Sequence, residues 1–376
     1  MEKRGLIILQ IVMLLFVLIG FFLGYSYIYQ FYDDVDSLAL LIVIYAAIII
    51  GMFLNVILHE LGHLVGGLRT GHRFLAMCIF SVTIVKENGR LKLKKYKVPG
   101  VSGGCILTPP DMKDGTFSFK LCISGGLIMN FLIGTVCLIL FYYVADTAYL
   151  WANLFLLIGI FGVYMGITNL IPFNIIVPSD GYLLFNMGKA ENTAMRHGFW
   201  SSSSAQKIDA EGVRPRDIPA ELYDWVDMNN IDNIFLLITL GNRYKCLLDK
   251  QEFDQARELV QFILDTAKNI SEMQRTSLDC DLLFHELINE CRPEELDRLY
   301  TKELKKIIKL ARTDISVQRV LYAYARLALN DTVKAKEHLD LFNKACTRSI
   351  FSGTVLCERD MIALIDKIAD ERSAAS

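Results

Sequence analysis

Residues 38–68 read LALLIVIYAAIIIGMFLNVILHELGHLVGGL, an apolar run in which the charged or imidazole side chains are His59, Glu60 and His63. A bilayer core requires about 20 apolar residues in a helix, so this run is long enough to span a membrane. Side chains of this kind are costly inside a spanning helix, and they are therefore candidates for function. The stretch predicts a transmembrane helix that carries chemistry close to one end.

The remaining sequence has the composition of a polytopic membrane protein. Of its 376 residues, 53% are hydrophobic and 21% are charged, which is too apolar for an ordinary soluble chain. Charged residues are absent from three further long segments, whereas residues 200–376 have the charge content of a globular domain. We expect four transmembrane helices, at residues 5–28, 38–68, 120–144 and 149–171.

The charges of the connecting loops predict how these helices are oriented. Residues 69–120 hold ten Lys and Arg residues, whereas the loops 29–37 and 145–148 hold none. Because positively charged loops stay in the cytosol, both termini and the region after residue 200 are expected on the cytosolic side. We therefore expect an integral, multi-pass protein of the plasma (cell) membrane. Nine cysteines without paired spacing fit a reducing compartment, and a net charge of −2 argues against a nucleic-acid partner.

The pattern His59-Glu60-Leu61-Gly62-His63 has the spacing of a zinc site. Residues four apart lie on one face of a helix, so both imidazoles can bind the same Zn²⁺ ion. Glu60 lies beside them, where a general base can take a proton from water that the metal has made more acidic. The pattern also arises by chance in surface helices, but a glutamate near a membrane interior costs on the order of 3 kcal/mol. Gly62 has no side chain and allows a neighbouring segment to approach closely.

The third ligand is expected where the fourth span ends. Two prolines stop the helix there, and Asp180 is the first charged residue after a long uncharged segment. A catalytic zinc has three protein ligands and one open position, so Asp180 would complete a site of two histidines and one aspartate. In the alternative interpretation, Asp180 only caps the helical segment that begins near Tyr182.

These residues together resemble a known family. The HELGH pattern at 59–63, the SGGLIMN segment at 124–130, and NLIP at 169–172 followed by Asp180 are similar, in that order, to three signatures of the site-2 protease family of intramembrane zinc metalloproteases. The resemblance covers roughly residues 38–188. It implies that zinc is held by the two histidines and the aspartate, and that membrane-protein or membrane-peptide substrates are cleaved within or next to their transmembrane segments. Seven residues, rather than the family's usual four, separate the proline from the aspartate, and Gly126 stands where the family usually has proline.

Two asparagines in these signatures are further site candidates. Asn130 and Asn169 would then face the site and bind the substrate backbone or the developing oxyanion. Asparagines inside a membrane also form hydrogen bonds between helices, and this alternative has equal weight.

The basic loop contains a hairpin pattern. Residues 79–84 and 91–96 are rich in strand-forming residues and flank the turn pair Asn88-Gly89. Such a hairpin could add an unwound substrate as an extra strand. Alternatively, its lysines contact anionic lipid headgroups.

The region after residue 205 is expected to be helical. Apolar residues recur there with helical spacing in pairs that resemble tetratricopeptide-type hairpins, which bind partners on concave surfaces. The predicted fold is thus mostly α, with a membrane helical core of about four spans, a short cytosolic β-hairpin region and a C-terminal, tetratricopeptide-like soluble domain. The expected divisions are 1–37 for the first helix and outer loop, 38–188 for the metalloprotease core with its hairpin loop at 69–118, 189–205 for a linker, and 206–376 for the helical domain.

The sequence therefore predicts an intramembrane zinc endopeptidase with Glu60 as general base. Its expected partners are a transmembrane protein or peptide substrate, the lipid bilayer, and a cytosolic protein bound by the helical domain. The first alternative is a catalytically inactive membrane scaffold of the same fold, although such a protein would usually have lost the glutamate or a ligand. A transporter built from broken helices is the second alternative, and the lack of inverted repeats disfavours it.

Overall fold

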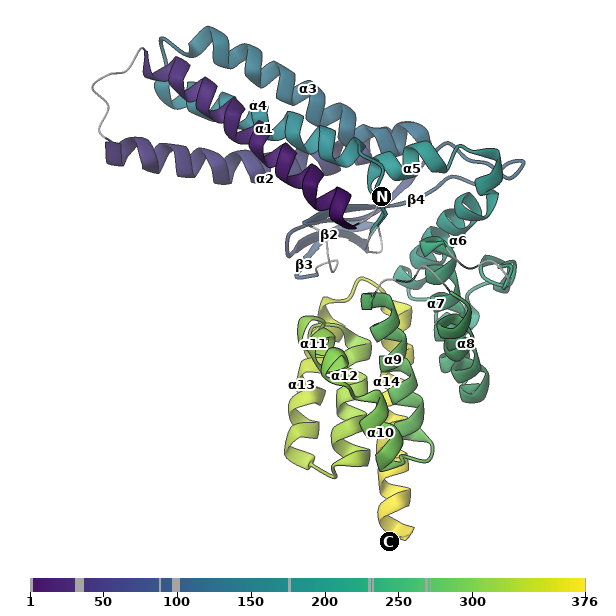
Figure 1. The fold of residues 1–376 in the computed structure, drawn as a ribbon. Coiled ribbons are helices and arrows are strands. Elements are labelled where there is room, and N and C mark those ends of the chain that lie inside the picture. The colour runs from purple at the N-terminus through teal and green to yellow at the C-terminus, as the bar shows by residue number, and fades with distance from the viewer. Residues whose placement is uncertain are drawn as a thin grey trace. The chain divides into compact units, whose positions relative to one another are not determined.

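The computed structural model describes residues 3–30, 37–87, 89–96, 102–174, 177–228, 231, 233–267, 270 and 272–375 (Figure 1). Its described residues are mostly helical, as predicted, and they include four short antiparallel strands. The chain divides into two compact units, each of which is described by itself. The first unit comprises Met1–Phe80 and Gly100–Asn192, and the second comprises Ser81–Pro99 and Thr193–Ser376.

Long apolar helices build the first unit, and their bounds lie within two residues of those predicted for the four spans. They are α1 (Lys3–Tyr29), α2 (Ser37–Arg69), α3 (Lys120–Val144) and α4 (Tyr149–Leu170), followed by the short α5 (Asp180–Asn186) and the 3₁₀ turn η1 (Ala190–Asn192). Among the described residues, three helices are long and apolar enough to cross a membrane: α3, α4 and the Ile42–Arg69 part of α2. In α1, the apolar helix found among the described residues is the shorter Leu18–Tyr29.

The outer surface of these helices is apolar. Large side chains such as Phe22, Tyr45 and Leu132 are 67%, 67% and 56% exposed. A water-soluble protein would bury such residues, whereas a lipid-facing surface exposes them. The exposed apolar surface and the helix lengths together indicate a membrane protein.

Glycines allow α2 and α3 to touch along their backbones. A Cβ atom added at Gly62 would lie 2.2 Å from the carbonyl oxygen of Gly125, and one at Gly66 would lie 2.2 Å from that of Leu121. Small residues of this kind are typical where membrane helices pack closely. The prediction that Gly62 permits close approach of a neighbouring segment is confirmed.

The described part of the basic loop contains four strands rather than a single hairpin. In the first unit, β1 (Arg73–Ile79) pairs antiparallel with β4 (Gly103–Thr108). In the second unit, β2 (Val82–Glu87) pairs antiparallel with β3 (Arg90–Lys94). The bounds predicted for the first strand, 79–84, are wrong. Phe80 has a φ of +55°, which an extended strand does not adopt, so β1 ends before it and β2 begins after it. At the predicted turn, Gly89 has a φ of +77°, while Asn88 lies outside the described residues.

The β2–β3 hairpin groups with the C-terminal helices, although we predicted it as part of the protease core. Lys94 Nζ donates a hydrogen bond to the carbonyl oxygen of Ser349 at 2.7 Å. The rings of Tyr96 and Phe351 meet edge to face, with centroids 6.2 Å apart. These contacts join segments that are about 255 residues apart, so local sequence patterns could not reveal them.

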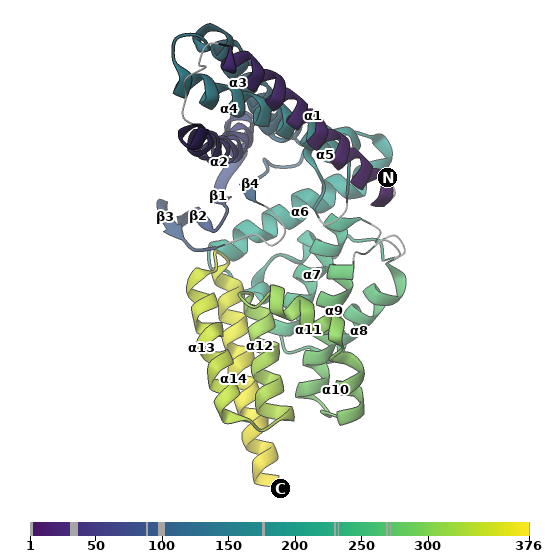
Figure 2. The same ribbon diagram turned by 60° about the vertical axis from the view of Figure 1, so that its left-hand side comes forward.

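The second unit is otherwise helical, as predicted. Its core contains fully buried residues such as Leu240, Phe284 and Phe342. Consecutive helices pack as pairs, including α7 with α8 and α12 with α13, and Figure 2 shows α12, α13 and α14 side by side. A specific tetratricopeptide identity stays a prediction. The helical segments are α6 (Thr193–Ala210), η2 (Pro215–Asp217), η3 (Ala220–Leu222), α7 (Ile234–Asp249), α8 (Phe253–Thr266), α9 (Glu272–Ile288), α10 (Pro293–Leu299), α11 (Lys302–Leu310), α12 (Ile315–Ala323), the π-helical η4 (Tyr324–Ala328), α13 (Thr332–Arg348) and α14 (Ser352–Ala375).

The segment predicted as a linker, 189–205, is largely helical. From Thr193 onward it forms α6, in which Ser201 and Ser202 are buried. Ser201 is fully buried, and its hydroxyl accepts a hydrogen bond from the indole N–H of Trp225 at 2.9 Å. A serine run that resembled a linker is therefore part of a helix, and two of its four members are buried.

Candidate metal centre

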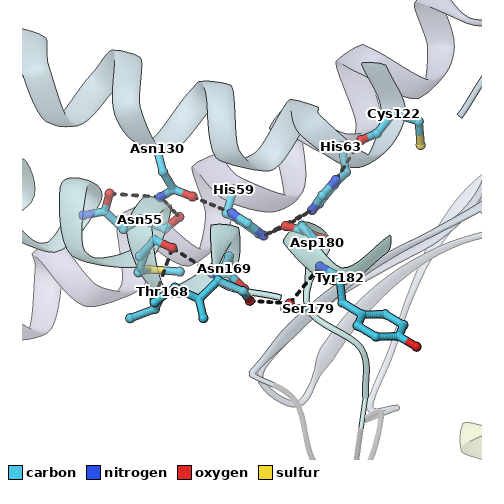
Figure 3. Close-up of polar contacts among 12 residues, drawn as sticks. Asn55, His59, His63, Cys122, Asn130, Thr168, Asn169, Ser179, Asp180 and Tyr182 are labelled. Atoms are coloured by element: carbon cyan, nitrogen blue, oxygen red, sulfur yellow. Dashed lines mark hydrogen bonds and ion pairs between the residues drawn. The ribbon is translucent and has the colours of Figure 1, made fainter. Parts of the chain in front are cut away.

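Three side chains from two helices converge at one point in the first unit (Figure 3). His59 and His63 lie on α2, and Asp180 is the first residue of α5. The two Nε2 atoms are 3.1 Å apart, and Oδ2 of Asp180 lies 3.1 Å from Nε2 of His59 and 3.3 Å from Nε2 of His63. In a tetrahedral zinc site with bonds of 2.0–2.1 Å, neighbouring ligand atoms lie about 3.3 Å apart. The three atoms therefore have the spacing of three corners of a zinc site.

The hydrogen bonds of the two imidazoles fix which nitrogen faces this point. His63 Nδ1 lies 2.9 Å from the carbonyl oxygen of Cys122, and a carbonyl only accepts, so Nδ1 carries the hydrogen. His59 Nδ1 lies 2.5 Å from Oδ1 of Asn130 and donates in the same way. Each neutral ring then directs the lone pair of its Nε2 toward Asp180.

This arrangement is suited to a cation. Oδ2 of Asp180 is buried and has no hydrogen-bond donor among the residues that the structure describes. Two imidazole lone pairs and a carboxylate oxygen repel one another at 3.1–3.3 Å, and a cation bound between them removes this repulsion. Two nitrogens and one oxygen with a free fourth position are a donor set typical of catalytic zinc. The residues present therefore fit a zinc ion.

Ser179 positions the aspartate. Its hydroxyl caps α5 by accepting a hydrogen bond from the backbone N–H of Tyr182, and it donates to the carbonyl oxygen of Ile171 at 2.7 Å. The cap is thus Ser179, which leaves the side chain of Asp180 directed at the histidines. Because the same hydroxyl reaches back to the end of α4, it ties together the two ends of the enlarged loop.

A glycine brings α5 against α4. A Cβ atom at Gly181 would lie 1.9 Å from the carbonyl oxygen of Leu170, so no larger residue fits there. Asp180, a candidate metal ligand, is therefore positioned by the close contact between its neighbour Gly181 and α4.

Gly126 allows the backbone of α3 to approach the two histidines closely. A Cβ atom there would lie 2.6 Å from Nε2 of His63 and 2.7 Å from Cε1 of His59. The α3 backbone thus lies directly against both rings. This contact explains why a residue with a side chain does not fit at position 126.

Glu60 is held beside the three candidate ligands by β4. Its side chain is buried and accepts a hydrogen bond from the backbone N–H of Cys105. A Cβ atom at Gly103 would lie 2.6 Å from Oε1 of Glu60, so the strand passes close to the carboxylate. The sequence pattern located Glu60, but it gave no sign of the strand that orients it.

The two candidate asparagines have different environments. Asn130 is fully buried on α3 and contacts the ring of His59 on the side away from Asp180. Asn169 donates from Nδ2 to the carbonyl oxygen of Met165, one turn back in its own helix, at 3.0 Å. Among the described hydrogen bonds, none joins Asn169 to His59, His63 or Asp180.

Sequence reasoning did not single out Asn55. It lies one helical turn before His59 on α2, is fully buried, and contacts Asn130. Its i−4 spacing from a candidate ligand was the available signal, but its contacts depend on α3 and α4.

The chain was compared with protein-family models, curated proteins and solved structures, and none of them matches. The chemistry of this site is therefore inferred from its own residues. Their burial matters for that inference, since the side chains of His59, His63 and Asp180 are only 8%, 14% and 16% exposed.

Proposed function

We propose that the protein is an intramembrane zinc endopeptidase that hydrolyses peptide bonds within or next to transmembrane segments of membrane proteins or peptides. The observation that carries the proposal is the convergence of His59, His63 and Asp180 within 3.3 Å, beside a buried glutamate, on a helix long and apolar enough to cross a membrane. The resemblance of these segments to site-2 protease signatures supports the same reaction.

The roles of the residues follow from their positions. His59, His63 and Asp180 would hold the zinc ion, which when bound lowers the pKa of water and polarises a carbonyl group. Glu60 takes one proton as the water oxygen attacks the peptide carbonyl carbon. It then gives a proton to the leaving nitrogen as the carbon–nitrogen bond breaks. The N–H of Cys105 keeps the carboxylate oriented for both transfers.

The membrane setting decides what kind of substrate is possible. A transmembrane helix uses its amide groups in internal hydrogen bonds, so the segment must be locally unwound before a carbonyl can reach the site. A buried site also excludes bulk water, which strengthens the electrostatic interactions inside it. A membrane-embedded or membrane-adjacent peptide segment is thus the expected substrate class.

Topology and recruitment complete the proposal. In this proposal α1 is a fourth span because residues 5–32 carry no charge. The loop charges put both termini and the helical domain in the cytosol, and the membrane is the plasma membrane. The paired helices of the second unit would bind a cytosolic substrate region or regulator.

A comparison of membrane segments in cells tests this function. Cells that express Glu60→Gln in place of the wild type should accumulate uncleaved transmembrane segments, which mass spectrometry of the membrane fraction would identify. Glu191→Gln, a change of the same kind at an exposed glutamate of η1, is the matched control and should accumulate none. Identical membrane fractions in all three strains would contradict a proteolytic role.

A further inference from the structure

Asn55 is a buried side chain that the reaction described above does not use. It lies on α2 with no exposed surface, and its Nδ2 donates to the carbonyl oxygens of Gly51 at 2.9 Å and Ile158 at 3.0 Å. These two bonds occupy both hydrogens of the amide. The orientation of the Asn55 side chain is therefore fixed, and its Oδ1 is left to accept.

That oxygen faces a second fully buried asparagine. Asn130 Nδ2 lies 3.4 Å from both Oδ1 and the backbone oxygen of Asn55. With its nitrogen directed at two acceptors, the Asn130 amide directs Oδ1 at Nδ1 of His59, 2.5 Å away (Figure 3). If the Asn130 amide were flipped, its oxygen would face two other oxygens and its nitrogen would face the N–H of His59. Both contacts would be repulsive, so the amide keeps the orientation described.

The hydrogen bonds of Asn55 and Asn130 determine which tautomer the imidazole of His59 adopts. Neutral histidine carries its hydrogen on one nitrogen only, and the hydrogen bond at the other side of the ring selects which one. An acceptor at Nδ1 places the hydrogen there and leaves the lone pair on Nε2, directed at Asp180. Partners of this kind orient metal-ligating histidines, and their loss typically weakens metal binding by about 10- to 100-fold.

We infer that Asn55 is a positioning residue for the metal centre: by holding the Asn130 amide in one orientation, it sets the tautomer and ring angle of His59. The same side chain bonds to Ile158 on α4, so it joins α2, α3 and α4 at the site. The small residue at Gly162 leaves room for this, since a Cβ atom there would lie 2.9 Å from Oδ1 of Asn55. The inference rests on the proposed metal site but not on proteolysis.

Zinc affinity of the purified full-length chain tests this role. Titration against a competing chelator should show that Asn55→Ala binds zinc about 10- to 100-fold more weakly than the wild type. Asn153→Ala is the matched control, because Asn153 is also a buried intramembrane asparagine but bonds to Tyr149 in its own helix. Its zinc affinity should equal that of the wild type.

A rescue variant separates positioning from packing. Both oxygens of a carboxylate accept, so an aspartate at position 130 needs no partner to orient it. Asn130→Asp in the Asn55→Ala background should therefore restore zinc affinity to within a few-fold of the wild type, together with the wild-type visible absorption spectrum of the Co²⁺-loaded protein. A folded double variant as weak as Asn55→Ala would show that Asn55 acts through packing and would overturn the inference.

The outcome also separates this inference from the proposed function. If the wild type binds no zinc, the metal site itself is wrong. If the wild type binds zinc and Asn55→Ala binds it equally well, the metal site stands and the role of Asn55 is wrong.

Discussion

Gly126 lies so close to His63 that a Cβ atom added to the glycine would be 2.6 Å from Nε2 of the histidine. The same atom would be 2.7 Å from Cε1 of His59. One wall of the candidate metal centre is thus bare backbone of α3. The space for an ion beside the imidazoles depends on the absence of a side chain at this position.

Gly126→Ala should weaken zinc binding without unfolding the helices. The added methyl group would push both imidazoles away from Asp180, so we expect the zinc affinity to fall by about 10- to 100-fold, as when ligand orientation is lost. Competition with a chelator measures this change. Gly104→Ala is the control, because a Cβ atom there meets nothing within 4 Å. Equal zinc affinity in both variants would mean that the rings do not occupy the positions described.

Glu60→Gln should retain zinc while losing most of the hydrolysis. The amide is similar in size and can still pack against β4, but it cannot accept a proton. A decrease of about 100- to 10,000-fold in the rate is typical when a general base is removed. The rate of cleavage of a purified substrate and the metal content of the same sample are the two measurements. Turnover close to that of the wild type would assign the base to another residue.

The topology can be tested with cysteine labels. In a background without native cysteines, a cysteine at Ser37 should react with a membrane-impermeant reagent from outside the cell. A cysteine at Lys95 should react only after permeabilisation, because the basic loop is expected in the cytosol. The opposite pattern would move the second unit to the outside.

The helical domain should show a pH-dependent stability that arises from His285. Burial, together with the positive charge of Arg319, lowers the pKa of His285 to about 3. The unfolded chain, with an ordinary pKa near 6.5, binds the proton more readily, so His285 adds stability above pH ~6.5 that is lost as the pH falls toward 3. The free energy of unfolding of the wild type relative to His285→Gln should therefore decrease by up to about 1.4 kcal/mol per pH unit in this range.

Amide hydrogen exchange in α9, followed from pH 7 to pH 4 in both proteins, measures this difference. Burial raises the pKa of Asp281 to about 7, but this carboxyl titrates in both proteins and cancels when they are compared. A difference in stability that does not change with pH would mean that His285 is not buried as a neutral ring.

The sequence was sufficient to predict features that depend on local patterns. The long helices follow from uninterrupted apolar runs, and the spacing of His59 and His63 places both imidazoles on one helical face. Asp180 could be proposed as their partner because a charged residue after a long uncharged segment is conspicuous. The structure brings these three residues together despite the enlarged loop.

Features that depend on distant contacts were missed. The pairing of β1 with β4 joins Arg73 to Thr108, and a period of two is hard to recognise in such short strands. The β2–β3 hairpin belongs with the second unit because of contacts near Ser349, far along the chain. The i−4 spacing of Asn55 from His59 was too weak a signal, since its contacts depend on how glycines such as Gly62 bring α2 and α3 together.

The zinc content of the purified protein shows whether His59, His63 and Asp180 form a metal centre. We expect one zinc ion per wild-type chain, measured by elemental mass spectrometry, and loss of that zinc in His59→Ala, His63→Ala and Asp180→Ala. His72→Ala is the control, because the His72 ring bonds to Thr70 outside the site, and it should keep its zinc. Zinc content that is unchanged in the three ligand variants, or absent from the wild type, would contradict a zinc centre at these residues.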